Sequence, residues 1–395
     1  MTVTIASRAD LTLEAFRRVA WEGERLVLAA GVAERIEAAR RAFLAYVGSQ
    51  PDQAIYGVTS GYGSNARRRM EAGEAAAFHA RSLAVGAMSF GEPLPDRTVR
   101  GILLARLANL VEGHGATSAR VVAAVVEMLN GERPVPTVPA QGNGCAGEIL
   151  PLYHLFAPLT DAFRMEIKEK GPLTNGAPCA AAFLAEAALA ARGRWTLACE
   201  ILALSAEAIR APLGAFDPVL AGLWNDPDAA VALERLQALL AGGGAERRSF
   251  QAPVSFRILP RVLARCHRAL RRAEATAAAI LPAVTDNPVF LPPDPLRPDP
   301  AHPFGRSFST GGYHDSHAVP ALDALAAEWA DLCLIAERHA GKLLDSAVSG
   351  LPEKLSANAA AVAGGAVALT YAPMASVGFL ESARAAATTT LLPGS

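Results

Sequence analysis

The sequence predicts a mainly α-helical protein in which a bundle of long helices follows a loop-rich N-terminal region. Long segments with helical apolar spacing carry no proline beyond their first turns, except Pro373. These segments are 177–191, 196–209, 259–281, 318–344 and 359–387. Alanine, which favours helix and close helix packing, is abundant, and strand signals are few. We therefore divide the chain into a loop-rich region, 1–176, and a central long-helix bundle, 177–395.

Short helices and loops alternate in the N-terminal region. Helical spacing is present at 12–20 and 31–47, and a further helix is expected from Asp96, as its N-cap, to about residue 112. Ser118 is the expected cap of another helix, which ends at Asn130-Gly131. The loops between these helices are the natural place for chemistry.

The composition indicates a globular chain with a large core. Of its 395 residues, 51% are hydrophobic and 19% are charged, and the net charge is −1. This balance argues against disorder, and against nucleic acid or an anionic membrane as a general partner. The five cysteines are scattered and fit neither a disulfide framework nor a zinc site. No signal peptide and no clean run of about 18 apolar residues is evident, so we expect a cytoplasmic protein.

The most unusual stretch is Ala140–Leu152, which contains three glycines within six residues, and one cysteine, before a helix-like segment. Only glycine adopts positive φ at little steric cost, and a helix N-terminus presents free N–H groups to a ligand. Taken alone, such a turn is more often a helix cap than a reaction centre.

Polar residues also occur in the other loops bounded by glycine or proline. Tyr56 lies in a glycine-rich loop, where a tyrosine can serve as an acid or base if its pKa is lowered. Arg257 can bind a carboxylate through two hydrogen bonds, and Asn175 and Gln251 offer amide donors and acceptors. Each of these residues also has a structural interpretation, as a packing, turn or surface residue.

A metal site is the weaker interpretation of His314-Asp315-Ser316-His317. Two histidines three residues apart can share one helix face and bind one metal ion. No third ligand is clustered with them in the sequence, so we expect no metal.

Several motifs follow one another in a fixed order along the chain. They are YGVTSGYG at 56–63, GEPL at 91–94, RLAN at 106–109, TNG at 174–176, QAPVSFR at 251–257, VTDNP at 284–288 and GGYH at 311–314. Together they resemble the aromatic amino-acid ammonia-lyase family, which includes histidine and phenylalanine ammonia-lyases and related aminomutases. The resemblance runs from about Tyr56 to Glu381 and implies the long-helix bundle of the ammonia-lyase (fumarase/aspartase-like) type.

The glycine-rich stretch then corresponds to the family's Gly-Ala-Ser-Gly-Asp-Leu-x-Pro-Leu segment. In the family, Ala-Ser-Gly cyclises and the serine loses water, which gives an electrophilic methylidene-imidazolone. Here the triad is Cys145-Ala146-Gly147. Alanine has no leaving group on its β-carbon, so we expect no such cofactor. Shifting the triad by one residue places alanine where the glycine nitrogen must attack, and it breaks the register with Pro151-Leu152.

The resemblance also implies roles for individual residues. Tyr56 is the lid tyrosine and the expected base, beside the triad residues Cys145, Ala146 and Gly147. The implied substrate-binding residues are Leu83, Asn175, Gln251, Arg257, Tyr313 and Glu381.

The chain departs from the family at three further places. Leu83 occupies the position at which histidine lyases carry a substrate-selecting histidine, and Val254 replaces a second tyrosine. The chain also ends soon after the helix that carries Glu381, whereas typical members continue. The resemblance implies a homotetramer, in which each active site takes loops from three subunits.

Three functions remain open from the sequence. The first is an elimination lyase that acts without the electrophile on an amino-acid-type substrate with a good leaving group, such as a trimethylammonium or a thiol. The loop N–H groups at 144–147 then stabilise developing negative charge. The second is chemistry at Cys145, whose pKa a helix N-terminus lowers, although cysteine also simply replaces a small alanine. The third is a retired lyase that acts as a binding or scaffold subunit, beside an active paralogue.

Overall fold

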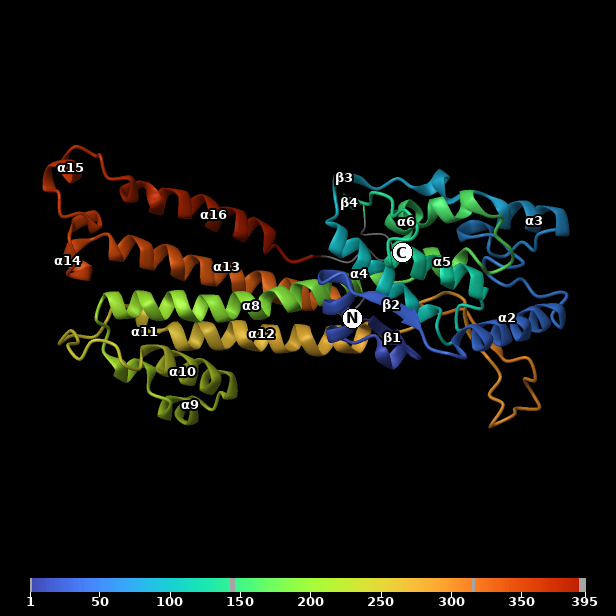
Figure 1. Ribbon diagram of the computed structural model, residues 1–395, viewed down its shortest axis with the longest axis horizontal. Helices are drawn as coiled ribbons and strands as arrows, with labels where there is room; N and C mark the ends of the chain where they lie inside the picture. The colour runs from blue at the N-terminus through green and yellow to red at the C-terminus, as the bar shows by residue number, and fades with distance from the viewer. Residues whose placement is uncertain (1, 143–145, 315–316, 391–395) are drawn as a thin grey trace. The chain divides into compact units, whose positions relative to one another are not determined.

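Helices dominate the computed structural model, which describes residues 2–142, 146–314 and 317–390 (Figure 1). The predicted mainly α class is confirmed. Contacts divide the chain into two compact units. Among the described residues, unit 1 contains those of 2–186 and 276–319, and unit 2 contains those of 187–275 and 320–390. The regions predicted from the sequence, 1–176 and 177–395, stay a prediction, since the units are defined by contacts and interleave along the chain.

Unit 1 combines short helices with small sheets. In its described residues, β1 (Thr2–Ile5) pairs in parallel with β2 (Arg25–Leu28), β3 (Phe90–Pro93) pairs antiparallel with β4 (Pro139–Gln141), and β5 (Val289–Leu291) pairs antiparallel with β6 (Arg306–Phe308). Its helices are α1 (Leu13–Phe16), the π-helix η2 (Arg17–Trp21), α2 (Val32–Gly48), α3 (Ala72–Ala80), α4 (Asp96–Arg106), α5 (Ala119–Leu129), α6 (Ile149–Ala162) and α7 (Gly171–Thr174). The 3-10 turns are η1 (Arg8–Asp10), η3 (Gly63–Asn65), η4 (Leu83–Gly86) and η5 (Leu107–Asn109).

The predicted helix starts in this region are nearly correct. Ser118 occupies the N-cap position of α5, as predicted. The N-cap of α4 is Pro95 rather than Asp96, which is instead the first helical residue. A carboxylate in that first turn still interacts favourably with the helix dipole.

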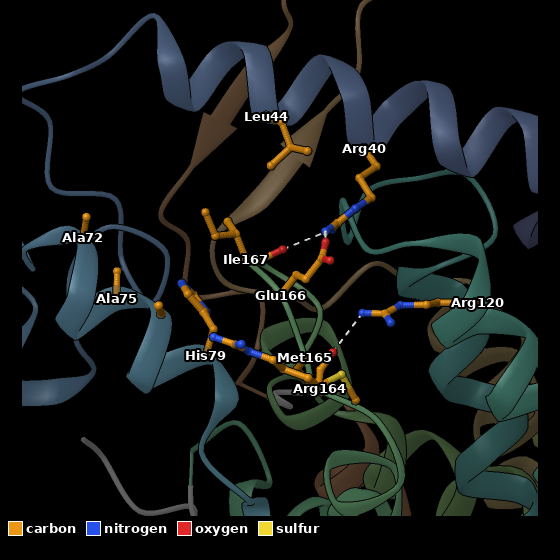
Figure 2. Close-up of a pocket in the computed structure, with 11 residues that line it drawn as sticks. Arg40, Leu44, Ala72, Ala75, His79, Arg120, Arg164, Met165, Glu166 and Ile167 are labelled. Atoms are coloured by element: carbon orange, nitrogen blue, oxygen red, sulfur yellow. Dashed lines mark hydrogen bonds and ion pairs between the residues drawn. The ribbon is translucent and has the colours of Figure 1, made fainter.

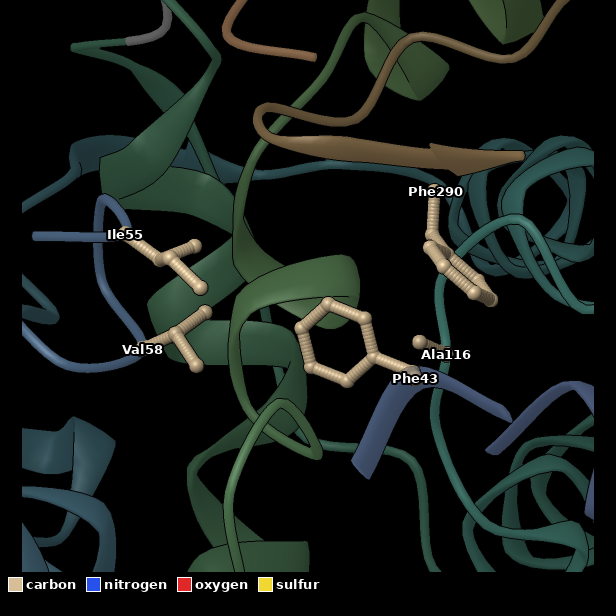
Figure 3. Close-up of a cluster of buried hydrophobic side chains, with 5 residues drawn as sticks. All are labelled: Phe43, Ile55, Val58, Ala116 and Phe290. Atoms are coloured by element: carbon tan, nitrogen blue, oxygen red, sulfur yellow. The ribbon is translucent and has the colours of Figure 1, made fainter. Parts of the chain in front are cut away.

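A cluster of buried apolar side chains supports the loop that carries Tyr56 (Figure 3). It consists of Phe43, Ile55, Val58, Ala116 and Phe290, of which Phe43 and Phe290 are fully buried. The rings of these two residues meet edge to face, with their centroids 5.1 Å apart. Since Ile55 and Val58 flank Tyr56, the cluster fixes the loop on both sides of that residue.

Unit 2 is built on long helices. Parts of α8 (Pro178–Ala208), α12 (Leu259–Ile280) and α13 (Ala318–Leu343) lie side by side in it (Figure 1). Buried polar contacts join them: Trp195 Nε1 donates to the Leu263 carbonyl at 3.0 Å, and Ser205 Oγ lies 2.7 Å from His339 Nδ1. The other elements are η6 (Leu213–Phe216), α9 (Val219–Trp224), α10 (Pro227–Leu240), α11 (Val254–Arg257), α14 (Ser346–Ser349), η7 (Glu353–Leu355), α15 (Ala359–Ala363), η8 (Ala368–Tyr371) and α16 (Ala372–Ala386).

Three of the predicted helical segments differ from the structure. Segments 177–191 and 196–209 form one helix, α8, because Gly193 is tolerated inside it while Trp195 is buried against α12. Segment 359–387 is instead broken at Gly364-Gly365, where Gly365 has φ of +67°. A positive φ ends a helical run, and glycine adopts it at little cost.

Segment 359–386 also bears on the expectation that the chain lacks a long apolar run. By length and composition, it is long and apolar enough to cross a membrane, and its most apolar 18-residue window has a mean hydropathy of 1.4. None of the most apolar part of this segment is buried within the chain. One such segment is weak evidence for a membrane span. The apolar side chains of its most apolar part are left at least partly exposed to solvent by the rest of the chain.

Candidate functional site

The glycine-rich stretch ends in a tight turn that is held against Asn175. Gly147 and Glu148 both have positive φ, +79° and +51°, and α6 begins directly after them. The Gly176 N–H donates to the Gly147 carbonyl at 3.1 Å. A β-carbon built on Gly147 would lie 2.5 Å from Asn175 Oδ1, so only glycine allows this approach. The predicted site residues Gly147 and Asn175 therefore come together, with Ala146 next to them in the turn.

Asn175 is in turn fixed by the VTDNP motif. Its Nδ2 donates to the Asn287 carbonyl at 2.9 Å. The Asn287 side chain accepts a hydrogen bond from the Thr310 N–H, also at 2.9 Å. Thr310 begins the loop that leads to Tyr313, which is half-buried. Two of the motifs named from the sequence, TNG and VTDNP, thus meet through backbone and amide contacts in unit 1, next to the residue that precedes GGYH.

The ring of Tyr62 lies against the predicted base, Tyr56, and against a second aromatic ring. The Tyr56 and Tyr62 rings lie 5.5 Å apart between centroids, and Tyr62 lies 5.0 Å from Phe78. The Gly63 N–H donates to the Tyr56 hydroxyl at 3.4 Å. Burial raises the pKa of Tyr62, and Tyr153 and Asp286 add to this effect. Tyr62 therefore stays protonated at neutral pH and cannot act as the base.

Tyr153 is an aromatic neighbour that the sequence did not single out. Burial raises the pKa of its phenol, and the nearby Tyr56 raises it further. A β-carbon built on Gly86 would lie 2.2 Å from the Tyr153 ring, so η4 packs closely on α6. The sequence signal that could have identified Tyr153 is its position in the first turns of the helix that follows the glycine-rich stretch.

Leu83 lies at the start of η4 and is buried, with 3% of its surface exposed. Its N–H donates to Thr160 Oγ1 in α6 at 3.1 Å. In the described structure its side chain belongs to the unit 1 core, and its contact with a substrate stays a prediction.

A buried arginine lies under Asn175. Arg106 Nη1 donates to the carbonyls of Pro172, at 2.7 Å, and of Asn175, at 2.9 Å. Its Nε and Nη2 atoms have no hydrogen-bond partner within the described residues. Burial lowers the pKa of this guanidinium to about 10, while Asp286 and Glu148 oppose that shift. An arginine remains charged at neutral pH even so, and it supplies positive charge beneath the turn.

Glu148 is a second buried group that the sequence did not predict. Its carboxylate accepts the N–H groups of Cys179, at 2.6 Å, and Ala180, at 2.8 Å, in the first turn of α8. Burial raises the pKa of Glu148 to about 7, although these two N–H groups act in the opposite direction. The carboxylate thus anchors the glycine turn to the start of the longest helix. The sequence signal that could have identified Glu148 is its position as an acidic residue between the triad and the start of a helix.

Lys168 and Asp286 form a buried ion pair in the same region. Lys168 Nζ lies 2.6 Å from Asp286 Oδ2 and also donates to the Pro288 carbonyl at 2.7 Å. Burial raises the pKa of Asp286, and Lys168 opposes the shift. Since Asp286 Oδ1 accepts the Asn287 N–H at 2.8 Å, the pair positions the residue that holds Asn175.

The other predicted substrate-binding residues belong to unit 2. Gln251 is exposed, and Arg257 is half-buried and donates from Nε to the Ala252 carbonyl at 2.9 Å. Glu381 is exposed on α16. Their convergence with Tyr56 and Asn175 stays a prediction.

Cys145, the candidate thiol, lies outside the described residues. Of the other four cysteines, Cys179, Cys199 and Cys266 are buried, whereas Cys333 is exposed. Burial raises the pKa of Cys199 and Cys266 to about 12, so neither forms a thiolate at neutral pH. Within the described part of the chain, no group of three His, Cys, Asp or Glu side chains is placed to hold a metal ion.

The sequence is similar to known proteins over most of its length. A family model described as aromatic amino acid lyase matches residues 11–164 and 160–393. A histidine ammonia-lyase of Deinococcus radiodurans is 31% identical over 379 residues, which cover 88% of this chain and 70% of that protein. Another, from Symbiobacterium thermophilum, is 30% identical over 383 residues, covering 89% of this chain and 72% of that protein.

Solved structures show the same fold. The histidine ammonia-lyase from Trypanosoma cruzi has a TM-score of 0.82 at 23% identity, covering 98% of this chain and 75% of that one. The ergothioneine degrading enzyme Ergothionase from Treponema denticola has a TM-score of 0.83 at 17% identity, covering 98% and 80%. The helical architecture is therefore that of the ammonia-lyases and related enzymes.

Proposed function

Because the chain belongs to the aromatic amino acid lyase family, we propose that it eliminates an amine or another good leaving group from an amino-acid-type substrate without a methylidene-imidazolone cofactor. The observation that carries this proposal is Ala146, at the position where the cyclising triad needs a hydroxyl. The neighbouring turn keeps a defined shape, through the Gly147 carbonyl and the anchored Glu148 carboxylate.

The residues at the triad do not fit the cofactor. The side chain of Ala146 is a methyl group, so it has no oxygen to lose as water and cannot become a methylidene carbon. No catalytic step is therefore assigned to that group. The chemistry must come from this chain's own side chains and backbone, acting on a substrate that needs no electrophilic assistance.

The proposed reaction is a base-assisted elimination. Tyr56 is the proposed base, and its phenolic oxygen takes the proton from the carbon next to the one that bears the leaving group. The electron pair of that C–H bond forms the new C=C bond, and the leaving group departs with the electrons of its own bond to carbon. A trimethylammonium group leaves as a neutral amine and needs no proton, which explains why such a substrate relaxes the need for an electrophile. Arg257 binds the substrate carboxylate, and Asn175 and Gln251 orient it.

A substrate screen tests this proposal, because the product is a conjugated acid that absorbs in the ultraviolet. The screen contains aromatic amino acids, their trimethylammonium betaines and thiol-bearing analogues. It also contains ergothioneine, since an enzyme of the same fold degrades that compound. We expect turnover of a betaine or thiol-bearing substrate and none of a simple amino acid. Rapid release of ammonia from histidine would contradict the proposed substrate class.

Tyr56→Phe isolates the base. Loss of the phenol is expected to lower kcat by about 10²–10⁴-fold. Tyr371→Phe is the matched control, because Tyr371 is 53% exposed and donates only to the Gly365 carbonyl. Unchanged turnover in Tyr56→Phe would remove Tyr56 from the mechanism.

Intact mass tests the absence of the cofactor. The mass expected for the wild-type chain is that of its unmodified sequence, and a mass lower by two water molecules would show cyclisation. Ala146→Ser restores the missing hydroxyl, and its intact mass is compared with that of the wild type. A mass lowered by two water molecules in this variant alone would show that Ala146 is what prevents cyclisation.

Two alternatives make different predictions. If Cys145 carries the chemistry, Cys145→Ala abolishes turnover, whereas the elimination proposed above tolerates this change. If the chain is a retired lyase that acts as a binding or scaffold subunit, no substrate in the screen gives product, and turnover appears only beside an active paralogue.

We also propose that the chain forms a homotetramer. Large apolar side chains are exposed on α16, where Met374 is 69% and Phe379 75% exposed, and on α8, where Leu204 is 71% exposed. Packing between copies is the expected cover for such surfaces. Light scattering measures the mass in solution, and a stable monomer at micromolar concentration would contradict this assembly.

A further inference from the structure

A pocket in unit 1 lies apart from the residues discussed so far. It has a volume of about 640 Å³ and is lined from α2, α3, the start of α5 and the segment 164–167 (Figure 2). None of Tyr56, Ala146, Gly147 or Asn175 lines it. Its size falls within the range of small-molecule sites, about 300–1,000 Å³.

The walls of the pocket are largely apolar. They are formed by Leu44, Ala72, Ala75, Ala76, Met165 and Ile167. The alanines on α3 leave space because their side chains are short. An apolar ligand body can replace water along these walls, which is the main source of affinity in such sites.

The polar groups of the pocket are mostly arginines, and two of the three are already paired. Arg40 is buried, donates to the Ile167 carbonyl at 3.0 Å, and pairs with Glu166 at 2.9 Å. Arg120 pairs with the buried Glu169 at 2.5 Å and donates to the Arg164 carbonyl at 3.0 Å.

The third arginine is left without a counter-charge. The Arg164 guanidinium has no hydrogen bond or ion pair with any residue in the described ranges, and its side chain extends toward α3 in Figure 2. His79 also lines the pocket, but its Nε2 donates to the Val58 carbonyl at 3.0 Å, and burial lowers its pKa. His79 is therefore neutral at pH 7 and adds no charge. Glu37, which lies near Arg120 without lining the pocket, accepts the Ala119 N–H.

We propose that this pocket binds an apolar organic monoanion, such as an aryl or branched alkyl carboxylate, whose charge pairs with Arg164 and whose hydrocarbon part lies against Leu44, Ala75 and Ile167. Arg164 is the arginine of this lining that has no ion pair among the described residues, and one such cation beside an apolar wall favours this class of ligand over a dianion or a neutral compound. A guanidinium binds a carboxylate through two parallel hydrogen bonds, which gives the ligand a defined orientation.

Isothermal titration calorimetry of the full chain tests the proposal with 2-naphthoate and its neutral amide, 2-naphthamide, as probes. We expect one naphthoate per chain, with a Kd on the order of 0.1–1 mM. The amide is expected to bind at least about tenfold more weakly, because it lacks the charge that pairs with Arg164.

Two variants locate the site. Ala75→Trp fills the pocket and is expected to abolish naphthoate binding, while Ala238→Trp, on the exposed face of α10, is the matched control. Arg164→Ala is expected to weaken binding about tenfold, whereas Arg194→Ala, at another exposed arginine, leaves it unchanged. Circular dichroism confirms that each variant is folded.

Three outcomes would overturn the proposal. They are the absence of naphthoate binding up to several times the expected Kd, equal binding of acid and amide, and undiminished binding in a folded Ala75→Trp. The last result would place the ligand elsewhere, including the site around Tyr56. Arg164→Ala alters an exposed side chain, so its binding loss is measurable even if Ala75→Trp does not fold.

Discussion

The two units hold their predicted site residues in different ways. In unit 1, Gly147 and Asn175 are fixed by hydrogen bonds within the unit. Arg106, which donates to the Asn175 carbonyl, and Glu148 are both buried. In unit 2, Gln251 and Glu381 are exposed, and the Arg257 guanidinium has one local hydrogen bond. Hydrogen bonds within unit 1 therefore hold Gly147 and Asn175 in a defined arrangement. The convergence of Gln251, Arg257 and Glu381 with them stays a prediction. A shared site between subunits, as proposed for the tetramer, would allow that convergence.

The largest expected effect contrasts one phenylalanine in each unit. Phe290→Ala removes a fully buried ring from the cluster that supports the Tyr56 loop, and a loss of about 3–5 kcal/mol in the free energy of unfolding is expected. Phe379 is 75% exposed on α16, so Phe379→Ala is expected to change that free energy by less than about 0.5 kcal/mol. Urea denaturation of both variants measures the difference. Similar losses in the two would show that unit 1 is not the more firmly packed unit around its site residues.

The second prediction compares two glutamates whose pKa values shift in opposite directions. Burial raises the pKa of Glu148 from 4.5 to about 7, so the native state holds a proton that the unfolded chain releases between these pH values. The free energy of unfolding therefore falls as pH rises from about 4.5 to about 7, by at most about 3 kcal/mol from this group, and levels off above. Glu148→Gln is expected to remove this slope.

Glu353 in unit 2 provides the control for that measurement. Its carboxylate accepts the Ser346 N–H at 2.9 Å, and this bond lowers its pKa to about 2. Because Glu353 is ionised in both states above about pH 5, Glu353→Gln is expected to leave the slope between pH 5 and pH 7 unchanged. Urea denaturation at a series of pH values measures both variants. A slope that persists in Glu148→Gln would show that the buried carboxylate is not its source.

The smallest expected effect on stability concerns the proposed carboxylate-binding arginine. Arg257→Ala removes one half-buried side chain with one local hydrogen bond, so a change below about 0.5 kcal/mol is expected. KM for the substrate identified in the screen is nevertheless expected to rise by at least about tenfold, because a charge-assisted pair is lost. Arg194→Ala is the matched control for both measurements. An unchanged KM would assign the substrate carboxylate to another group.

The sequence identified residues within the named motifs, but it did not identify the buried charged residues that support them. Asn175 and Gly147 were identified, and the structure brings them together. Lys168 and Glu148 were missed, because each acts through a partner far along the chain: Asp286 lies 118 residues from Lys168, and Ala180 lies 32 residues from Glu148. Local spacing carries no signal for such pairs. The two predicted halves of α8 are likewise continuous, because burial of Trp195 outweighs the weak helix propensity of Gly193.

By itself, the sequence determined the helical class and the family, and it carries the proposal that the chain forms no methylidene-imidazolone. That proposal rests on covalent structure, since no fold can supply the oxygen that Ala146 lacks. Only the tertiary structure decided which groups are buried and which charges are paired. The raised pKa of Glu148, the unpaired atoms of Arg106 and the pocket beside Arg164 all depend on which distant segments pack together and exclude water. Burial and pairing of this kind are properties of contacts between segments, and a linear pattern does not record them.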